Sequence, residues 1–461
     1  MVPPLREKLR SLCASFKGGQ VANHWHEWVK LTSDKQILSD IRGISIECTE
    51  FPTQHRLRGT SNYSGTETRL VDVEIQKLQT KEVVKVTRKG PGQIISDIFL
   101  HPKKDGSYRL ILNLKKFNEV VEYHHFKMDS LTTIIRLIEQ NCYMASIDIK
   151  DAYYSLATKA CDQNFLCFSW KGQLYHFTCL PNGLSSAPRK FTKIFKVPLA
   201  HLHKQGHISL GYLDDFYLQG QTYDHCVANV IDTTMLFIKL GLVPHPEKCN
   251  FIPSQELTFI LNSITMTVKL TGEKATNLQS TCQKLIKCRS PSIREVAQVI
   301  GKIVSSFPGT IHGTLYYRHI ERDKSLALKQ HKGNFDAKMI LSDSAKSELT
   351  WWVQNITSTF NVISHGQPTF QITTDASLLG WGAECEDVST GGHWTPVEAK
   401  HHINCLEMRA AFLGLQTFAK EKSHIHIRLR LDNTTGVSVL SHMGTNHSVE
   451  CNNICKEIWE W

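Results

Sequence analysis

The sequence predicts a mixed α/β (α+β) protein that is divided into several folded units. Its 461 residues are about three times the length of an average domain. Hydrophobic residues make up 41% of the chain and charged residues 21%, which is typical of globular proteins. Segments with the two-residue period of strands alternate with segments that have the 3.6-residue period of helices. These observations exclude a single small module, a disordered chain and a collagen-like chain.

The alternation is clearest in the first half of the chain. Apolar runs bounded by turn residues predict strands at residues 94–101, 108–114, 143–149, 165–170, 174–180 and 208–219. Apolar residues at intervals of three and four predict helices at residues 71–86, 129–141, 186–205 and 224–241. A polar stretch at residues 54–70 is interpreted as a linker.

The second half changes character twice. A cation-rich section has its clearest helices at residues 292–307 and 342–356. Strands then return at 369–377, 380–386 and 424–432, with a helix at 404–421 and two further helical stretches. The resulting division has four parts: a leader of unknown role (1–70), a mixed α/β unit (71–270), a basic helical unit (271–365) and a second mixed unit (366–461).

The net charge favours a polyanionic partner. Lys and Arg number 53 against 43 Asp and Glu, which gives a formal charge of +10 and is typical of proteins that bind nucleic acid. No apolar run reaches the ~18 residues of a membrane helix, and the first residues lack the apolar core of a signal peptide. The 14 cysteines form no C-x-x-C pair, which fits reduced thiols. We therefore expect a cytoplasmic or nuclear protein, neither secreted nor membrane-spanning.

Three acidic residues in the first mixed unit suggest catalysis. Asp214 and Asp215 lie between two strand-like runs, as at the tip of a hairpin, and Asp148 ends an alternating strand 66 residues earlier. Each has an ordinary explanation, because Asp favours tight turns and also caps helices. Brought together, however, three carboxylates would repel one another unless a divalent cation neutralised them. Mg²⁺ prefers oxygen ligands, and two such ions about 4 Å apart support phosphoryl transfer.

Five segments in this region occur in a recognisable order. They are HPKKDGSYRLILNLKKFN from residue 101, D-x-x-x-A-Y from Asp148, LPNGLSSAPRKFTK from residue 180, YLDD from residue 212 and GLVPHPEKCNF from residue 241. This order resembles the reverse transcriptases, which are right-handed polymerases with fingers, palm and thumb. The resemblance implies an RNA-directed DNA polymerase that acts on an RNA or DNA template-primer. Residues 71–270 would form fingers and palm, and residues 271–365 the thumb and connection.

The resemblance also implies roles for individual residues. Asp148 and Asp214 would hold two Mg²⁺ ions, or Mn²⁺ in their place, and Asp215 would complete the acidic cluster. Lys103 and Arg109, on a fingers hairpin, would bind the triphosphate of the incoming deoxynucleotide. For each cation the alternative is a solvated surface position.

Four further residues follow from the same resemblance. Tyr153 would exclude a 2′-hydroxyl by its bulk, and Lys248 would donate a proton to pyrophosphate; a core tyrosine and a surface lysine are the alternatives. Asn182 stands where many relatives have Gln or Phe, and its amide would contact the nucleotide. Asn262 stands where relatives usually have Gly, and we expect it to preserve the turn because Asn tolerates left-handed backbone.

A second acidic set lies in the last section. Asp375 on a predicted strand, Glu407 on a helix and Asp432 at a strand end are separated by 32 and 25 residues. The set resembles the active site of ribonuclease H, an endonuclease that binds two Mg²⁺ and hydrolyses the RNA of RNA–DNA hybrids. For Asp432 the alternative is a helix N-cap.

The last section also departs from the ribonuclease H pattern. The family continues to another strand and a fourth acidic residue, so we expect this domain to be incomplete at its C-terminus. Glu457 and Glu460 are interpreted as surface acids rather than replacements for that residue.

Three motifs indicate a subgroup. They are N-L-K-x-x-N from Asn113, the run SIREVAQVIGKIVSSFPGTIHGTLYYRHIERDKSLAL from Ser292 and AKSELTWW from Ala345. They resemble DIRS-type retrotransposons, which encode a tyrosine recombinase. The main hypothesis is a retrotransposon polymerase with attached ribonuclease H. The alternative is a catalytically inactive relic or an adopted nucleic-acid-binding protein.

Overall fold

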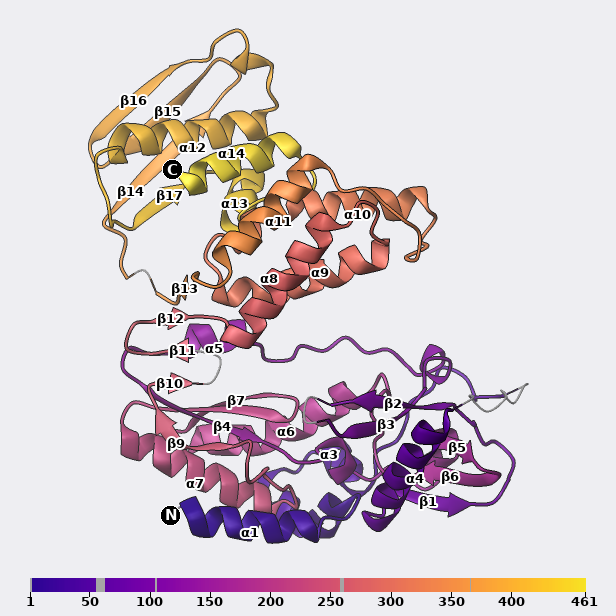
Figure 1. The fold of residues 1–461 in the computed structure, drawn as a ribbon. Coiled ribbons are helices and arrows are strands. Elements are labelled where there is room, and N and C mark those ends of the chain that lie inside the picture. Colours follow the sequence, from indigo (N-terminus) through magenta and orange to yellow (C-terminus); the bar gives the residue numbers. More distant parts are fainter. Residues whose placement is uncertain (1, 55–62, 104–105, 258–260, 365) are drawn as a thin grey trace. The chain divides into compact units, whose positions relative to one another are not determined.

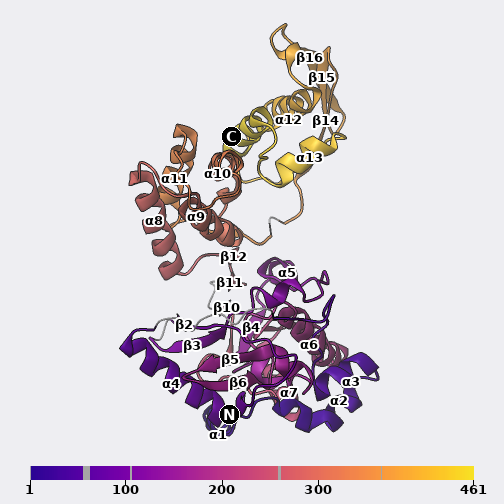
Figure 2. The ribbon, with the colours of Figure 1, turned by 90° about the vertical axis from the view of Figure 1, so that its right-hand side faces the viewer.

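The computed structural model describes residues 2–54, 63–103, 106–257, 261–364 and 366–461. The chain forms two compact units, Met1–Gln255 and Glu256–Trp461, which Figures 1 and 2 show from two directions. Both units combine helices and sheets, so the predicted mixed α/β fold class is confirmed.

The first unit is built on a four-stranded antiparallel sheet in the order β7-β8-β4-β9. Its strands are β4 (Tyr143–Asp148), β7 (Ile208–Tyr212), β8 (Asp215–Gly220) and β9 (Asn250–Ser254). Helices α6 (Ala187–Lys204) and α7 (Tyr223–Lys239) pack against this sheet, close to the bounds that the sequence predicts. Phe195, Phe216 and Phe237 meet between sheet and helices with ring centroids 4.9 to 5.8 Å apart. Burying each ring stabilises the packing by about 2 kcal/mol, so sheet and helices form a firm base for the loops at the strand ends.

Smaller elements complete this unit. A three-stranded sheet has the order β1-β6-β5, and β2 pairs with β3 as a hairpin. Their bounds are β1 (Val84–Thr87), β2 (Ile98–Pro102), β3 (Tyr108–Leu112), β5 (Cys167–Trp170) and β6 (Gln173–Phe177), and a short helix α5 spans Leu131–Leu137. The predicted strands are present, and each is shorter than the apolar run that indicated it.

Helix α4 (Gly65–Thr80) begins earlier than the sequence predicts. Ser64 and Glu67 form a capping box, in which each side chain bonds the other residue's backbone N–H and so starts the helix. The predicted linker at 54–70 is therefore wrong from Gly65 onward. Residues 55–62 of that linker lie outside the described part of the chain.

The C-terminal end of the helix predicted at 71–86 is also wrong. Glu82 adopts a φ of 56°, which a right-handed helix cannot contain. The following residues Val84–Thr87 form β1, which pairs with β6. Two adjacent β-branched valines favour the strand, and the apolar spacing alone did not distinguish the two conformations.

The N-terminal residues fold onto the first unit. They form α1 (Val2–Ala14), α2 (Trp25–Leu31) and α3 (Lys35–Arg42). Leu9, Trp28 and Ile41 are fully buried in the core of this unit. Trp28 Nε1 also donates to the carbonyl of Leu240 at 3.1 Å, just after α7. This segment is therefore part of the structural base of the first unit.

The second unit contains a helical part and a sheet part. The helical part has α8 (Gly272–Lys287), α9 (Ile293–Ser306), α10 (Arg318–Gln330) and α11 (Asp343–Asn355), beside short strands β10 (Glu256–Leu257), β11 (Leu261–Asn262), β12 (Thr267–Val268) and β13 (Asn361–Val362). Trp352 is fully buried among these helices, and Tyr316 stacks on Trp351 with centroids 4.1 Å apart. These aromatic side chains are thus packing residues.

The sheet part has the order β16-β15-β14-β17, and α12 packs against its central strands. The elements are β14 (Phe370–Ala376), β15 (Gly380–Cys385), β16 (Val388–His393), α12 (Ile403–Ala419), β17 (Ile427–Arg430), α13 (Thr434–Ser441) and α14 (Val449–Glu460). Strand β17 runs parallel to β14, and the other pairs are antiparallel. The sequence did not predict β16, because its residues are almost all exposed and lack an apolar alternation. Among the described residues no helix has both the length and the apolar character needed to cross a membrane.

Candidate active site

The first acidic cluster lies at one end of the β7-β8-β4-β9 sheet. Asp148 is the last residue of β4 and pairs directly with Asp215, the first residue of β8. Asp214 occupies the tight turn between β7 and β8 beside Leu213, whose φ is 55°. The carbonyl of Asp214 accepts a hydrogen bond of 2.8 Å from Ile149 N, which ties the turn to the residue after Asp148. The predicted hairpin tip is confirmed, and the structure brings the three acids together.

The electrostatics of this cluster disfavour three free carboxylates. Burial, followed by the charges of Asp214 and Asp148, raises the pKa of Asp215 to about 6. Burial also raises the pKa of Asp148, while Lys248 opposes the shift. Lys248 Nζ lies 3.3 Å from Asp148 Oδ2. The carboxylates are close and partly desolvated, so the donor set fits divalent cations with a preference for oxygen ligands.

A hollow of about 790 Å³ opens beside these acids. Of the residues that the sequence predicts for substrate and metal binding, this hollow is lined by Lys103, Arg109, Asp148, Tyr153, Asn182, Asp214 and Lys248. Lys103 and Arg109 come from the β2–β3 hairpin, and Lys248 comes from the segment before β9. Asp215 is in the acidic cluster but does not line the hollow. Cationic and acidic groups from four distant segments therefore face one space, as binding of a metal-associated polyphosphate requires.

Tyr153 and Asn182 have defined surroundings. The ring of Tyr153 packs edge-on against Phe191 at 5.3 Å between centroids. Burial, followed by the charge of Asp214, raises the pKa of Tyr153 to about 12, so the phenol stays protonated. Asn182 Nδ2 donates to the hydroxyl of Tyr154 at 3.1 Å, so part of its amide is engaged within the protein.

Sequence reasoning missed three basic residues of this hollow: Lys81, Lys150 and His245. Lys81 Nζ lies 2.6 Å from Asp151 Oδ2. Asp151 has a φ of 50°, so this ion pair holds a strained turn directly after Asp148. The two residues are 70 positions apart. The one sequence signal for this contact was Asp151 itself, which lies within the D-x-x-x-A-Y segment that begins at Asp148.

Asn262 preserves its turn in a different way from the expected one. It lies in β11 and does not adopt a left-handed backbone. Its Oδ1 instead accepts hydrogen bonds of 2.9 Å from the backbone N–H of Ile264 and Thr265. Met266 takes the positive φ, 48°.

The second acidic cluster forms in the sheet part of the second unit. Ligand oxygens of Asp375 (β14), Glu407 (α12) and Asp432 (after β17) all lie within 4.8 Å of one another. Glu407 is only 5% exposed, and in the described part of the chain its Oε2 has no hydrogen-bond partner. Burial, then the charges of Asp432 and Asp375, raise the pKa of Glu407 to about 7. A buried, unpartnered carboxylate oxygen beside two acids fits a divalent cation.

Three acidic residues of the last section had alternative interpretations. Asp432 is not a helix N-cap, because Asn433 caps α13 with an Oδ1 contact of 2.7 Å to Gly436 N. Glu457 pairs with Arg409 at 2.5 Å. Glu460 accepts from the Tyr316 hydroxyl at 2.6 Å. Both glutamates therefore have partners of their own and are not part of the cluster.

Comparison with known proteins defines the class of the first unit. Residues 101–261 match the family model "Reverse transcriptase (RNA-dependent DNA polymerase)". This range includes the acidic cluster and most of the residues that line its hollow. The chain therefore contains a reverse transcriptase domain.

Curated relatives of this chain include transposon polyproteins. The chain is 24% identical over 204 residues to the Transposon Tf2-3 and Tf2-4 polyproteins of Schizosaccharomyces pombe (strain 972 / ATCC 24843), an alignment that covers 44% of this chain. The chain spans about 15% of the length of these relatives. The similarity is therefore to a small part of these transposon polyproteins.

Solved structures show the same fold over a larger part of the chain. The foamy viral protease-reverse transcriptase in complex with RNA/DNA hybrid matches with a TM-score of 0.57 at 15% identity, over 90% of this chain and 55% of that one. The foamy viral protease-reverse transcriptase dRH in complex with ds DNA matches with a TM-score of 0.58 at 14% identity, over 95% and 79%. At these identities the likeness is one of fold, and it agrees with the predicted polymerase architecture.

Proposed function

We propose that this chain is the RNA-directed DNA polymerase of a retrotransposon, adding deoxynucleotides to a primer on an RNA or DNA template. The central observation is the register that pairs Asp148 with Asp215, with Asp214 in the adjoining turn. This pairing gathers three carboxylates beside a hollow that also contains Lys103 and Arg109. The family match over residues 101–261 supports the same activity.

Asp148 and Asp214 would hold two Mg²⁺ ions, or Mn²⁺, and Asp215 would complete the acidic set. When bound, such ions activate the primer hydroxyl and neutralise charge on the leaving group. Burial raises the pKa values of Asp148 and Asp215, which supports this assignment.

The other lining residues would bind and orient the nucleotide. Lys103 and Arg109 would pair with the triphosphate from the β2–β3 hairpin. The ring of Tyr153, held by Phe191, would occupy the space of a 2′-hydroxyl and so select deoxynucleotides. Lys248 would protonate the departing pyrophosphate, a step of general acid catalysis.

Primer extension tests the polymerase proposal. The purified chain is given a primed RNA template, deoxynucleotides and Mg²⁺, and Asp148→Asn and Asp214→Asn are compared with it. We expect each variant to lose about a thousandfold in rate, since removing a metal ligand costs several kcal/mol of transition-state stabilisation. The matched control is Asp224→Asn, an exposed acid in the first turn of α7, which should keep full activity. Tight template binding without extension by the unaltered chain would instead support the alternative hypothesis, an inactive relic or an adopted nucleic-acid-binding protein.

We also propose ribonuclease H activity for residues 366–461, carried out on RNA–DNA hybrids. The observation behind it is the convergence of Asp375, Glu407 and Asp432 within 4.8 Å. These three would hold two Mg²⁺ ions that activate water for phosphodiester hydrolysis. The test is cleavage of a labelled RNA–DNA hybrid, which Glu407→Gln should abolish while Glu457→Gln leaves it unchanged.

The remaining assignments are part of the same proposal. Fingers and palm would span residues 71–270, thumb and connection 271–365, and the lineage would be the DIRS-type retrotransposons. The protein would act in the cytoplasm or the nucleus, where its nucleic-acid substrates are found.

A further inference from the structure

A second hollow in the first unit lies apart from the acidic cluster. It has a volume of about 470 Å³ and shares no lining residue with the first hollow. Helix α6 forms one side, and α3 with the end of α2 forms the other. Helices α3 and α6 lie side by side in Figures 1 and 2. Five cationic residues of α6 line it: Arg189, Lys190, Lys193, Lys196 and Lys204.

The first two of these cations are neutralised within the protein. Arg189 Nη2 lies 2.5 Å and Lys190 Nζ 2.8 Å from the carboxylate of Glu47, and Lys190 also lies 3.3 Å from Asp40. Although burial alone would raise the pKa of Glu47, these two cations hold it below its ordinary value.

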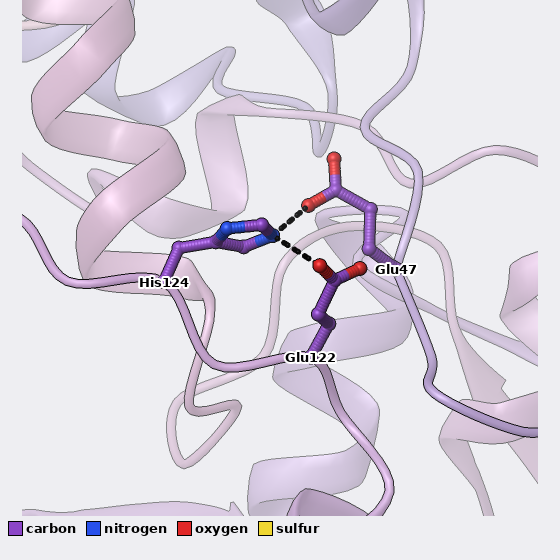
Figure 3. Close-up of side chains that lie close together, drawn as sticks. All are labelled: Glu47, Glu122 and His124. Atoms are coloured by element: carbon purple, nitrogen blue, oxygen red, sulfur yellow. Dashed lines mark ion pairs between the residues drawn. The ribbon is translucent and has the colours of Figure 1, made fainter.

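A histidine extends the same network, as Figure 3 shows. His124 Nε2 lies 3.3 Å from Glu47 and 3.2 Å from Glu122. Glu47, Glu122 and His124 are close enough to share a metal ion. Arg189 and Lys190 already occupy the oxygens of Glu47, however, so this network is a set of ion pairs rather than a metal site.

The other three cations of α6 are not neutralised in this way. Lys193, Lys196 and Lys204 are exposed, and within the described residues none has a carboxylate within 4.0 Å. Because 3.6 residues make one turn, positions 193, 196 and 204 share one face of α6, over about 16 Å of its length. Asp34 is the one acid of the hollow without an ion pair to another described residue, and it accepts hydrogen bonds from Gln36 N and Ile37 N as the cap of α3. The face thus presents a row of uncompensated positive charge, which fits a partner with repeated negative charges.

The direction of α6 relates this row to the active site. Asn182 lines the first hollow, and α6 begins five residues later, at Ala187. The row of lysines lies roughly 9 to 26 Å further along the helix axis. A strand that leaves the acidic cluster along α6 would meet the lysines in sequence.

We propose that this row, Lys193, Lys196 and Lys204, binds the sugar–phosphate backbone of the unpaired template strand that extends beyond the polymerase active site. The inference rests on the proposed polymerase function, because a template strand must run unpaired towards that site. A single strand is flexible enough to follow a helix, and lysines bind its phosphates without reading its sequence. The row would therefore hold templates of any sequence.

Binding measurements on two template lengths test this proposal. One primer–template has an unpaired extension shorter than about 4 nucleotides, and the other exceeds about 16, the usual range of single-strand sites. Affinity is measured by fluorescence anisotropy at several salt concentrations for the unaltered chain and for Lys193→Gln/Lys196→Gln/Lys204→Gln. The control with the same loss of charge is Lys8→Gln/Lys89→Gln/Lys239→Gln, three exposed lysines that line neither hollow.

We expect the row variant to bind the long extension about tenfold more weakly, with a salt slope smaller by about 2, because about 0.7 counterions are released per neutralised phosphate of a single strand. Its affinity for the short extension, and the control's affinity for both, should stay unchanged. Equal weakening on both templates, no weakening, or competition by a separate strand as effective as the extension would each overturn the proposal. Single-nucleotide addition by the unaltered chain is measured alongside, so that loss of the polymerase proposal is seen separately from loss of this one.

Discussion

The ammonium of Lys248 lies 3.3 Å from Oδ2 of Asp148, although the two residues are 100 positions apart. The contact depends on the pairing of β4 with β9, which begins two residues after Lys248. The backbone N–H of Asp148 also donates to Cys249 Sγ at 3.3 Å. Lys248, which lines the hollow, therefore contacts Asp148, the carboxylate that we assign to metal binding.

This contact predicts how Lys248 variants behave. Lys248→Gln should lower kcat for nucleotide addition about a hundredfold, which is a typical contribution of a general acid, with a smaller change in KM. Lys248→Arg should keep the positive charge but support little proton transfer, because a guanidinium does not release its proton at neutral pH. The measurement is single-turnover extension across pH. A variant that changes KM alone would show that Lys248 only binds the substrate.

The position of Tyr153 leads us to expect that its side chain selects deoxynucleotides over ribonucleotides. Tyr153→Val should increase incorporation of ribonucleotides relative to deoxynucleotides by 10-fold or more, because the shorter side chain leaves room for a 2′-hydroxyl, and contacts of this size are worth about 1–3 kcal/mol. Tyr153→Phe keeps the ring on Phe191 and should keep the selectivity. Competition between the two nucleotide types during extension measures the ratio. Equal selectivity in all three proteins would contradict the role.

The raised pKa of Glu407 leads us to expect that the free energy of unfolding depends on pH. Its pKa is raised to about 7, so the folded state favours the protonated form. The free energy of unfolding should therefore fall as pH rises from the unfolded value near 4.5 through about 7. In EDTA, Glu407→Gln should raise Tm at pH 8 and lose this advantage at pH 4. Mg²⁺ should raise the Tm of the unaltered protein at pH 8 more than that of the variant, and an equal rise in both would argue against a metal role for Glu407.

A second pH-dependent contribution to stability is expected from His319 in the helical part of the second unit. Its Nδ1 lies 2.9 Å from the buried carboxylate of Glu348, and this hydrogen bond raises the pKa of the imidazole. The stabilisation is fully present below the unfolded pKa near 6.5 and is lost as pH rises through the higher folded value. His319→Phe should cost about 2 kcal/mol at pH 5 and less at pH 9, as a charged hydrogen bond is removed. Denaturant unfolding at both values measures this, with the exposed His331→Gln as control; an equal cost at both pH values would refute it.

The sequence determined much of the first acidic cluster by itself. The run around Asp214 and Asp215 has a strand period on both sides and turn residues between, and this local pattern was sufficient to predict a hairpin tip. The helical spacing of apolar residues in α6, α7, α9 and α11 was equally clear, because each helix packs one apolar face against a core. The acids of the second cluster were found because their order on strand, helix and strand resembles the ribonuclease H pattern.

Other features were decided only by tertiary structure. Strand β16 has no apolar period, since its exposed residues gain stability from pairing with β15 rather than from burial. The contacts of Lys81 with Asp151 and of Lys248 with Asp148 join residues 70 and 100 positions apart. Local periodicity reports only the backbone conformation and buried face of one segment. Which distant side chains meet, and which lysines of α6 have no counter-charge in the described part of the chain, depends on how the segments pack against one another.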